Sequence, residues 1–387
     1  MRKLCNAVII ICLVVMYASL GVALTSTPKS IESNNDEISG DQNLPEYEVL
    51  HSIEEFDERI KSEVENGLDG DFHIMVSTNV TEDEIKECCR QLDIFEGRAT
   101  EYVFSNSSQQ DEDGPVIESD EMAVNVTYKR SIESYVYDAI MNGKDIPEDK
   151  TEASEVKTVL EKILKDCIKD GMSDYEKELA IHDYLINNSI YPDEASYEAD
   201  YDRSSYGVLV KGKGVCEGYA RTTTLLLRCC GVESKLIRVK EIKENTDETY
   251  YYFWTQVKLD GKWYNLDVSA DSNYAGDDDY YHTYFNVTTD IMKKQVAFEE
   301  TELETCDSMD MNYYNKDGRF FTSNDSFQSY VKSQLEEGNR EMIECAITDL
   351  DLSQETLNFI FDYEGVSTYR KNWRGVDDYK VLKIIIN

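Results

Sequence analysis

Hydrophobic positions in the first third of the chain follow the periods of strands and of one helix. Thr81 begins a helix that extends to about Gln91, and Glu84 completes a Thr-x-x-Glu capping box with Thr81. Strand-like alternation occurs in three segments: Phe72–Ser77, Glu101–Phe104 and Met122–Tyr128. These elements predict a small α+β N-terminal domain over residues 67–147.

Helical spacing returns after the acidic segment 146–155, which we interpret as a domain boundary. Four apolar residues recur at helical intervals: Val156, Val159, Ile163 and Cys167. Ser173 then begins a second helix, to about Asn187, with a capping box completed by Glu176. The apolar stripe of this helix includes His182, which we expect to be a core histidine with satisfied hydrogen bonds.

A third helix follows a glycine-rich segment. Gly212 and Gly214 precede Cys216, and the stretch from Tyr219 to Arg228 contains no helix breaker and is apolar on most sides. Such a helix should be central and buried. Cys216 would lie at its N-terminus, where the helix dipole lowers the pKa of a thiol. Cys216 is therefore a candidate nucleophile, with a buried structural cysteine as the alternative.

A β-hairpin is predicted around Asp260-Gly261, a strong two-residue turn signal. The turn joins two alternating segments, Tyr250–Leu259 and Lys262–Val268. In this register Trp254 lies opposite Asp267 and Tyr252 opposite Ser269, with all four side chains on one face. Tyr252 and Asp267 are diagonal neighbours within hydrogen-bonding reach. A solvated polar face is the alternative interpretation.

After about Asn312 the pattern changes again. An amphipathic helix is predicted at Ser326–Glu337, and strands are predicted at Met342–Ile347 and Tyr379–Ile386. We therefore expect a small C-terminal α/β module over residues 311–387. The intervening domain, which holds Cys216, spans residues 148–310.

Charge excludes some classes of partner. Asp and Glu number 78 against 39 Lys and Arg, so the formal net charge is −39. Such a polyanion is repelled by phosphate backbones and anionic lipids, so nucleic acid is not an expected partner. Cationic ligands, Ca²⁺ or a basic cell-wall polymer remain compatible. The acidic stretch Asp271–Asp279 lacks EF-hand spacing, and a solvated loop is expected there.

The N-terminus has the organisation of an export signal. Arg2 and Lys3 precede an apolar run from Ala7 to Leu20, and Gly21-Val22-Ala23 provides a cleavage site. Residues 1–23 are thus predicted to be a signal peptide, with an uncleaved membrane anchor as the alternative. Residues 24–66 are acidic and polar and are predicted to be a linker. Either interpretation predicts an extracellular or cell-surface protein.

The cysteines give no metal-binding pattern. An even number of them remains after the signal peptide: Cys88, Cys89, Cys167, Cys216, Cys229, Cys230, Cys306 and Cys345. An exported chain permits disulfides between them, although most are expected to be small buried hydrophobic residues. The paired cysteines are adjacent, which matches no zinc motif.

Two stretches resemble the transglutaminase-like superfamily, which shares a papain-like thiol fold. They are Gly-Val-Cys-Glu-Gly-Tyr-Ala around Cys216 and Phe-Trp-Thr-Gln-Val-Lys-Leu-Asp-Gly-Lys-Trp-Tyr-Asn-Leu-Asp ending at Asp267. The helix Glu176–Leu185 and the segment Tyr284–Val287 also resemble this family, so the resemblance covers roughly residues 172–292. It implies an α+β fold in which a central helix packs on an antiparallel sheet, here flanked by small α+β modules.

The resemblance assigns roles to three positions. Cys216 takes the place of the nucleophile and Asp267 that of the orienting acid, but the family histidine, two residues before the tryptophan, is replaced by Tyr252. A phenol with a pKa of about 10 cannot act as the base near neutrality. Loss of a general acid–base typically costs about 10²–10⁴ in rate. His282 is the candidate substitute base, although an exposed loop histidine is the expected interpretation.

We therefore expect an exported, degenerate transglutaminase-like protein that binds a peptide, protein or cell-wall ligand in its cleft. Trp254, Tyr219 and Glu217 are the candidate binding residues, and no cofactor or metal is expected. Membrane contact is expected only through an uncleaved signal. The alternatives are an active cysteine peptidase or acyl transferase on peptide amides, using Cys216, Asp267 and a non-standard base, and a purely structural cell-surface module.

Overall fold

The protein is described by a computed structural model. The described residues are 48–106, 120–193, 201–243, 249–272, 282–299, 301, 303–339, 341–350, 353–363, 366–376 and 378–386. The predicted signal peptide, the first part of the predicted linker and most of the acidic stretch Asp271–Asp279 lie outside these ranges.

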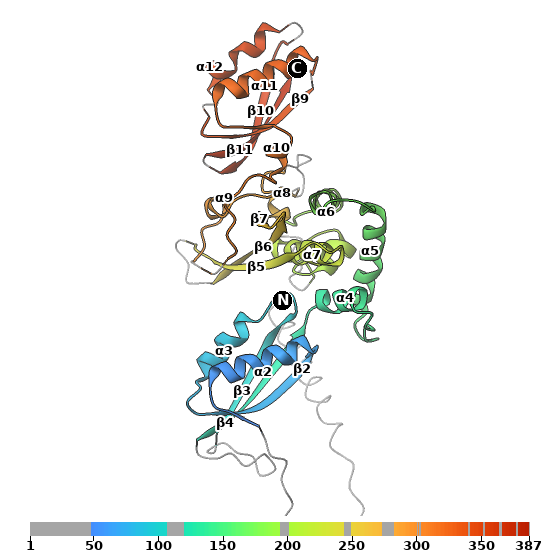
Figure 1. The fold of residues 1–387 in the computed structure, drawn as a ribbon, viewed down its shortest axis with the longest axis vertical. Coiled ribbons are helices and arrows are strands. Elements are labelled where there is room, and N and C mark those ends of the chain that lie inside the picture. Colours follow the sequence, from blue (N-terminus) through green and yellow to red (C-terminus); the bar gives the residue numbers. More distant parts are fainter. Residues whose placement is uncertain are drawn as a thin grey trace, which may run out of the picture. The chain divides into compact units, whose positions relative to one another are not determined.

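The first sheet contains the three predicted strands and one short additional strand. Its order is β1-β2-β4-β3, made by β1 (Val49–Leu50), β2 (Gly70–Ser77), β4 (Glu121–Arg130) and β3 (Gly97–Asn106). Helix α3 (Glu82–Gln91) has the predicted capping box, in which Thr81 and Glu84 bond each other's backbone N–H groups. Helices α2 and α3 lie against this sheet (Figure 1), and their buried side chains form one hydrophobic cluster with those of its strands.

The linker prediction is wrong for residues 53–65, which form helix α2 (Ile53–Glu65). Phe56, Ile60 and Val64 recur every four residues and are buried against the sheet. Ser52 caps the helix by accepting the N–H of Glu55. The apolar stripe consists of only these three residues in an otherwise acidic segment. The acidic composition therefore suggested a linker although the apolar residues recur at helical spacing.

The central region consists of helices around one short antiparallel sheet. The helices are α4 (Ile132–Met141), α5 (Thr151–Cys167), α6 (Asp174–Asn188) and α7 (Cys216–Cys229), with a π-helical turn at Gly207–Lys211. Helix α7 packs on the sheet β5-β6-β7, made by β5 (Ser234–Glu241), β6 (Tyr250–Leu259) and β7 (Lys262–Leu266) (Figure 1). Leu225, Leu226 and Leu227 of α7 are fully buried, as the sequence predicted for a central helix. The α+β fold class is confirmed.

The hairpin has the predicted turn but a shorter ladder. Asp260 and Gly261 both have positive φ, 49° and 80°, and Leu259 pairs with Lys262. Pairing ends at Thr255 and Leu266, because Asp267 leaves the strand to cap helix α8 (Val268–Asp271). The predicted pairings of Trp254 with Asp267 and of Tyr252 with Ser269 are therefore wrong. The side chain of Asp267 accepts the N–H of Ala270 and so ends the ladder.

The last sheet contains the two predicted C-terminal strands. Its order is β10-β11-β9-β8, made by β10 (Tyr369–Val376), β11 (Tyr379–Ile386), β9 (Met342–Thr348) and β8 (Phe320–Phe321). The predicted helix is α11 (Asn324–Glu336), and the shorter helices are α9 (Thr289–Gln295), α10 (Tyr313–Lys316), α12 (Gln354–Leu357) and the 3₁₀ turn Asn358–Asp362. The edge strand β10 was not predicted, since its residues are largely polar.

The eight cysteines within the described ranges are all free. The three that lie outside residues 148–310, Cys88, Cys89 and Cys345, are buried in the cores of the flanking sheets. Among the described helices, none combines the length and apolar character needed to cross a bilayer.

Candidate thiol site

Cys216 is held at the N-terminus of α7 by close backbone packing. It is the first residue of the helix, after Val215, whose N–H is bonded by the carbonyl of Asp202 at 2.9 Å. A Cβ atom at Gly214 would lie 2.4 Å from Val208, and one at Gly218 would lie 2.3 Å from the Asp202 carbonyl. The glycines on both sides of Cys216 therefore allow the segment before α7 to pack against its first turn.

The thiol lies beside the backbone of β6. The ladder between β6 and β7 runs from Thr255 to Leu259 of β6, so the residues of β6 before Thr255 lie outside it. Burial raises the pKa of the Cys216 thiol to about 12, and the carboxylate of Asp267 acts in the same direction. The backbone N–H groups of Phe253 in β6 and of Glu217 oppose this shift in the pKa without overcoming it.

Tyr252 and Asp267 meet as the sequence predicted. The phenol of Tyr252 donates to Oδ2 of Asp267 at 2.8 Å, and the hydroxyl of Ser269 donates to Oδ1 at 2.7 Å. Burial, together with the charges of Asp267 and Cys216, raises the pKa of Tyr252 well above its usual value. Burial also raises the pKa of Asp267. The phenol is thus a proton donor to the carboxylate and cannot accept the thiol proton near neutrality.

Gln295, the last residue of α9, completes this arrangement and was missed by the sequence reasoning. Its Nε2 lies 3.1 Å from both the Tyr252 hydroxyl and Asp267 Oδ2. Its Oε1 is buried without a hydrogen-bond partner. Nothing in the local pattern of α9 marks this residue, because it is 28 positions from Asp267 and outside the motifs that resemble the family.

The candidate binding residues are buried. Trp254 and Tyr219 are each 1% exposed, and Glu217 is 6% exposed. The indole of Trp254 donates to Asn265 at 2.9 Å, and Glu217 accepts from Arg221 at 3.0 Å. Packing and internal hydrogen bonds occupy all three side chains in this structure, and their contact with a ligand stays a prediction. Their size and polarity indicated recognition, but packing accounts for them.

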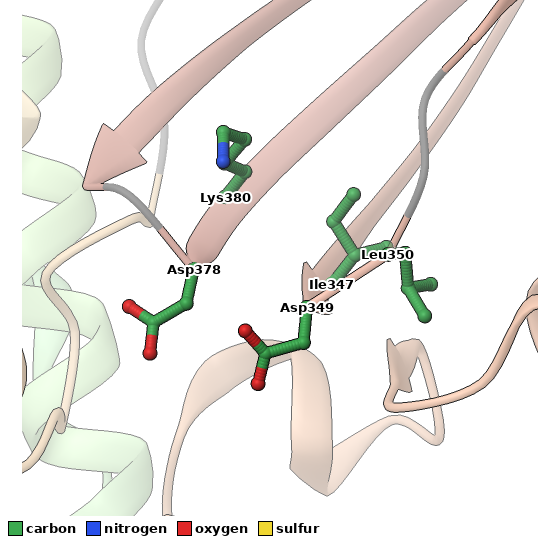
Figure 2. Close-up of a pocket in the computed structure, with 5 residues that line it drawn as sticks. All are labelled: Ile347, Asp349, Leu350, Asp378 and Lys380. Carbon is green, nitrogen blue, oxygen red and sulfur yellow. The ribbon is translucent and has the colours of Figure 1, made fainter.

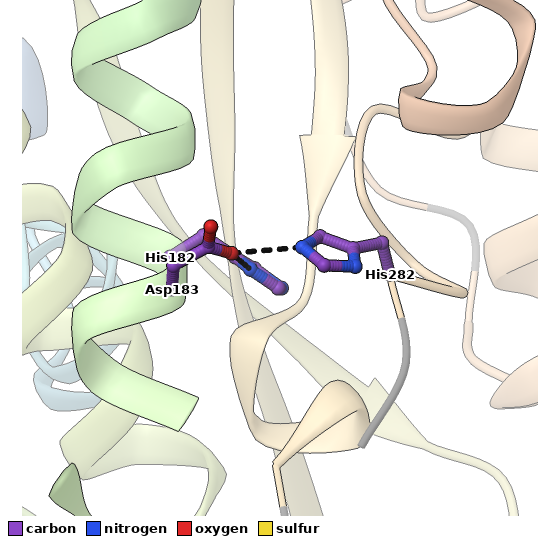
Figure 3. A group of neighbouring side chains, drawn as sticks. All are labelled: His182, Asp183 and His282. Carbon is purple, nitrogen blue, oxygen red and sulfur yellow. Dashed lines mark hydrogen bonds and ion pairs between the residues drawn. The ribbon is translucent and has the colours of Figure 1, made fainter. Parts of the chain in front are cut away.

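His282 is neither exposed nor bonded to the thiol. The residue is 9% exposed, and its ring stacks on that of Tyr313 with the ring centroids 3.7 Å apart. Its Nε2 lies 2.8 Å from Asp183 Oδ1 (Figure 3). The predicted exposed loop histidine is wrong, and the ring is held by α6 rather than by Cys216. His182 is a satisfied core histidine, as predicted: although burial opposes its charge, hydrogen bonds to Asp183 and Asp271 raise its pKa to about 9.

One cavity is lined by strands of the sheet on which α7 packs, and a second lies in the C-terminal sheet. A cavity of about 980 Å³ is lined by α3 and by the ends of β5 and β6, including Arg90, Arg238, Lys240 and Tyr251. A smaller cavity of about 290 Å³ lies in the C-terminal sheet, between Asp349 and Asp378 (Figure 2). It is built without any residue of the thiol site, and its Asp378 is already paired with Lys294 at 2.6 Å.

Comparisons with known proteins agree with the thiol-domain interpretation. The family model of the Transglutaminase-like superfamily matches residues 161–268, which include Cys216, Tyr252 and Asp267. No curated protein matches the chain significantly.

Solved structures show only distant similarity. A crystal structure of a TGase is 12% identical, with 58% of this chain and 59% of that chain covered and a TM-score of 0.25. This chain therefore spans less than two thirds of that protein. Calcium-bound LapG of Legionella pneumophila is 13% identical, with 49% of this chain and 98% of that chain covered and a TM-score of 0.23. The family match and the observed helix-on-sheet core together assign this region: residues 161–268 belong to the transglutaminase-like superfamily.

Proposed function

We propose that this protein is a transglutaminase-like domain that has lost acid–base catalysis and binds a peptide, surface protein or cell-wall ligand beside Cys216. One observation carries the proposal. The hydroxyl at the position of the family histidine donates its proton to Asp267 instead of accepting one from the thiol. Without a base, the triad cannot form the thiolate that attacks an amide.

The cavity at the ends of β5 and β6 supports a peptide ligand. Tyr251, 45% exposed, offers an aromatic surface, and the guanidinium of Arg238 lies 5.4 Å from its ring centroid. Charges of both signs line the same cavity, because Lys240 pairs with Glu299 at 2.7 Å. Arg238 also interacts electrostatically with Glu217, the residue after Cys216. A peptide with mixed charges could therefore bind near the thiol, and Tyr251 replaces Trp254 as the recognition residue that we favour.

We also propose that the protein is exported from the cytoplasm. A charged start, an apolar run and a small-residue cleavage site favour a secreted or cell-surface protein. An exported ligand such as a peptide, a surface protein or a cell-wall polymer would then share its compartment.

A working cysteine peptidase or acyl transferase is the alternative, and one observation favours it. Cys216 is free and begins helix α7, and the helix N-terminus and the backbone N–H groups of Phe253 and Glu217 favour the thiolate against the opposing effect of burial. This activity would require a base that comes to the thiol when substrate binds.

The test is the pH dependence of Cys216 alkylation by iodoacetamide, followed by mass spectrometry of the Cys216 peptide so that other thiols do not interfere. We expect the parent to react only at strongly alkaline pH. Tyr252→His should lower the apparent thiol pKa by at least one unit, because an imidazolium beside the thiolate stabilises it. Tyr252→Phe, which removes only the hydroxyl, is the control and should not activate the thiol.

Two results would count against the proposal. A parent thiol with an apparent pKa below about 8 would favour the enzyme. Activation in Tyr252→Phe as strong as in Tyr252→His would mean that the phenol merely blocks the thiol, so that the cleft retains another base.

A further inference from the structure

A second polar cluster is built on elements other than those that hold Cys216. His182 and Asp183 lie in α6, and His282 precedes Tyr284 in the segment after β7 and α8. One oxygen of Asp183, Oδ1, lies 3.2 Å from His182 Nδ1 and 2.8 Å from His282 Nε2 (Figure 3). One ligand atom from each of the three residues falls within 4.8 Å of the others. The proposed function does not use any of them.

A fourth residue orients the cluster. Asp271, the last residue of α8, lies with Oδ2 3.2 Å from Nε2 of His182. Both of its oxygens also accept the backbone N–H of Tyr284, at 3.0 and 3.1 Å, which fixes the carboxylate. This contact fixes the orientation of the His182 ring, with Nδ1 facing Asp183, and a bound metal ion would displace the proton that Nδ1 shares with that carboxylate. A carboxylate behind a histidine is the usual outer partner of a metal-binding imidazole.

We propose that His182 Nδ1, His282 Nε2 and the Asp183 carboxylate bind one divalent transition-metal ion of the zinc class, with Asp271 as the outer partner of His182. Two imidazoles favour zinc, nickel, copper or iron over calcium and magnesium, which prefer oxygen ligands. Two histidines and one carboxylate leave a fourth position for water or a ligand atom.

Access and spacing are compatible with this ion. Both histidine rings are nearly or fully buried, but the side chain of Asp183 is 45% exposed, so the ion has a route from solvent. A tetrahedral site with bonds of about 2.0–2.1 Å separates its ligand atoms by about 3.3 Å. The present separations of up to 4.8 Å and the stacked rings, 4.7 Å apart, require the His282 ring to turn when the ion binds.

The sequence did not indicate this site. His182 and His282 are far apart in the chain, His282 and Asp183 being 99 positions from each other. Zinc motifs are recognised by short spacings, which a site assembled from α6 and a distant segment does not show.

The experiment is a competition titration of untagged, metal-free protein with Zn²⁺ against a chromophoric chelator. Millimolar Ca²⁺ is present throughout to occupy the many surface carboxylates, and the thiols that react near neutral pH are blocked with iodoacetamide after gentle reduction. We expect one Zn²⁺ per chain. Asp183→Asn and His282→Gln should each weaken binding at least about 100-fold, more than the 10–100-fold typical of losing an outer partner. His73→Gln, which changes an exposed histidine of β2, is the matched control and should bind as the parent does.

Cobalt provides the second measurement. Co²⁺ bound at this site should give the visible absorption of a low-coordinate ion without the near-ultraviolet band of a cobalt–thiolate bond. Circular dichroism verifies that each variant is folded, and Asp183→Asn, at a half-exposed side chain, is the variant least able to disturb the core.

Three results would contradict the proposed metal site. The parent could bind Zn²⁺ no more tightly than Asp183→Asn does, or His73→Gln could lose as much Zn²⁺ affinity as the cluster variants do. The third is a cobalt–thiolate band in the spectrum of the parent. Tyr252→His separates this inference from the proposed function, because it changes thiol reactivity but should leave zinc affinity unaltered.

Discussion

The thiol site contains two groups that both keep their protons near neutral pH, the thiol of Cys216 and the phenol of Tyr252. Burial raises the pKa values of both Cys216 and Tyr252, and the charge of Asp267 disfavours ionisation of each group. Asp267, fixed by Tyr252, Ser269 and Gln295, keeps the position in which it would orient an imidazole. The frame for a triad is retained while its proton acceptor is replaced, which is why one substitution, Tyr252→His, is an informative test.

The buried carboxyl group of Glu178 makes the stability of the fold depend on pH. This residue of α6 is fully buried, and Nδ2 of Asn286 donates to its Oε2 at 2.8 Å. Burial raises the pKa of Glu178 from about 4.5 to about 8. Its favourable contribution to folding is therefore fully present below about pH 4.5 and is lost as the pH rises through about 8, because the unfolded chain ionises first.

Glu178→Gln should remove this dependence, since the amide has the shape of the protonated acid and does not titrate. Between pH 5 and pH 8 the free energy of unfolding of the parent should fall by on the order of 3 kcal/mol relative to the variant. Urea unfolding of both proteins at several pH values measures the difference. Parallel curves for parent and variant would show that Glu178 does not remain protonated in the fold.

At the scale of elements, α6 begins with a reciprocal cap. Ser173 accepts the N–H of Glu176, and Glu176 accepts the N–H of Ser173 at 2.7 Å. The same helix carries Glu178, His182 and Asp183. The integrity of α6 therefore affects both the buried acid and the proposed metal site.

Ser173→Ala should lower the free energy of unfolding by about 1 kcal/mol, because an N–H at the helix start loses its acceptor. Ser329→Ala is the matched control: this serine is exposed within α11 and bonds only a carbonyl of its own helix, so alanine should be neutral or slightly stabilising. Equal losses from the two substitutions in urea unfolding would contradict the role of the cap.

At the scale of the whole molecule, charge dominates. A formal net charge of −39 means that folding brings many like charges together. Raising NaCl from 0.02 M to 0.5 M shortens the Debye length from about 20 Å to about 4 Å and should screen this repulsion. We expect Tm to increase by several degrees, measured by differential scanning calorimetry at neutral pH.

A Tm that stays constant or falls with NaCl would mean that attractive pairs, such as Lys294 with Asp378, outweigh the repulsion. Choline chloride at equal ionic strength is the control, because a bulky cation screens charge without entering a specific carboxylate site. A rise with NaCl alone would therefore indicate sodium binding rather than screening.

The sequence by itself determined the features that depend on neighbouring residues. The capping boxes at Thr81 and Ser173, the turn at Asp260-Gly261 and the helix that begins at Cys216 were predicted because each is set by local backbone chemistry. The contact of Tyr252 with Asp267 followed from the hairpin register, even though the ladder ends before those residues.

Only the tertiary structure decided which distant side chains meet and which are buried. Gln295 reaches Asp267 from α9, and His282 reaches Asp183 on α6, across separations that leave no periodic signal. Trp254 suggested a ligand-binding face in the sequence but is buried, and the acidic α2 suggested a linker but packs on a sheet. Hydrophobic periodicity specifies which face of an element is buried, whereas the identity of the partner across that face arises only when the elements pack together.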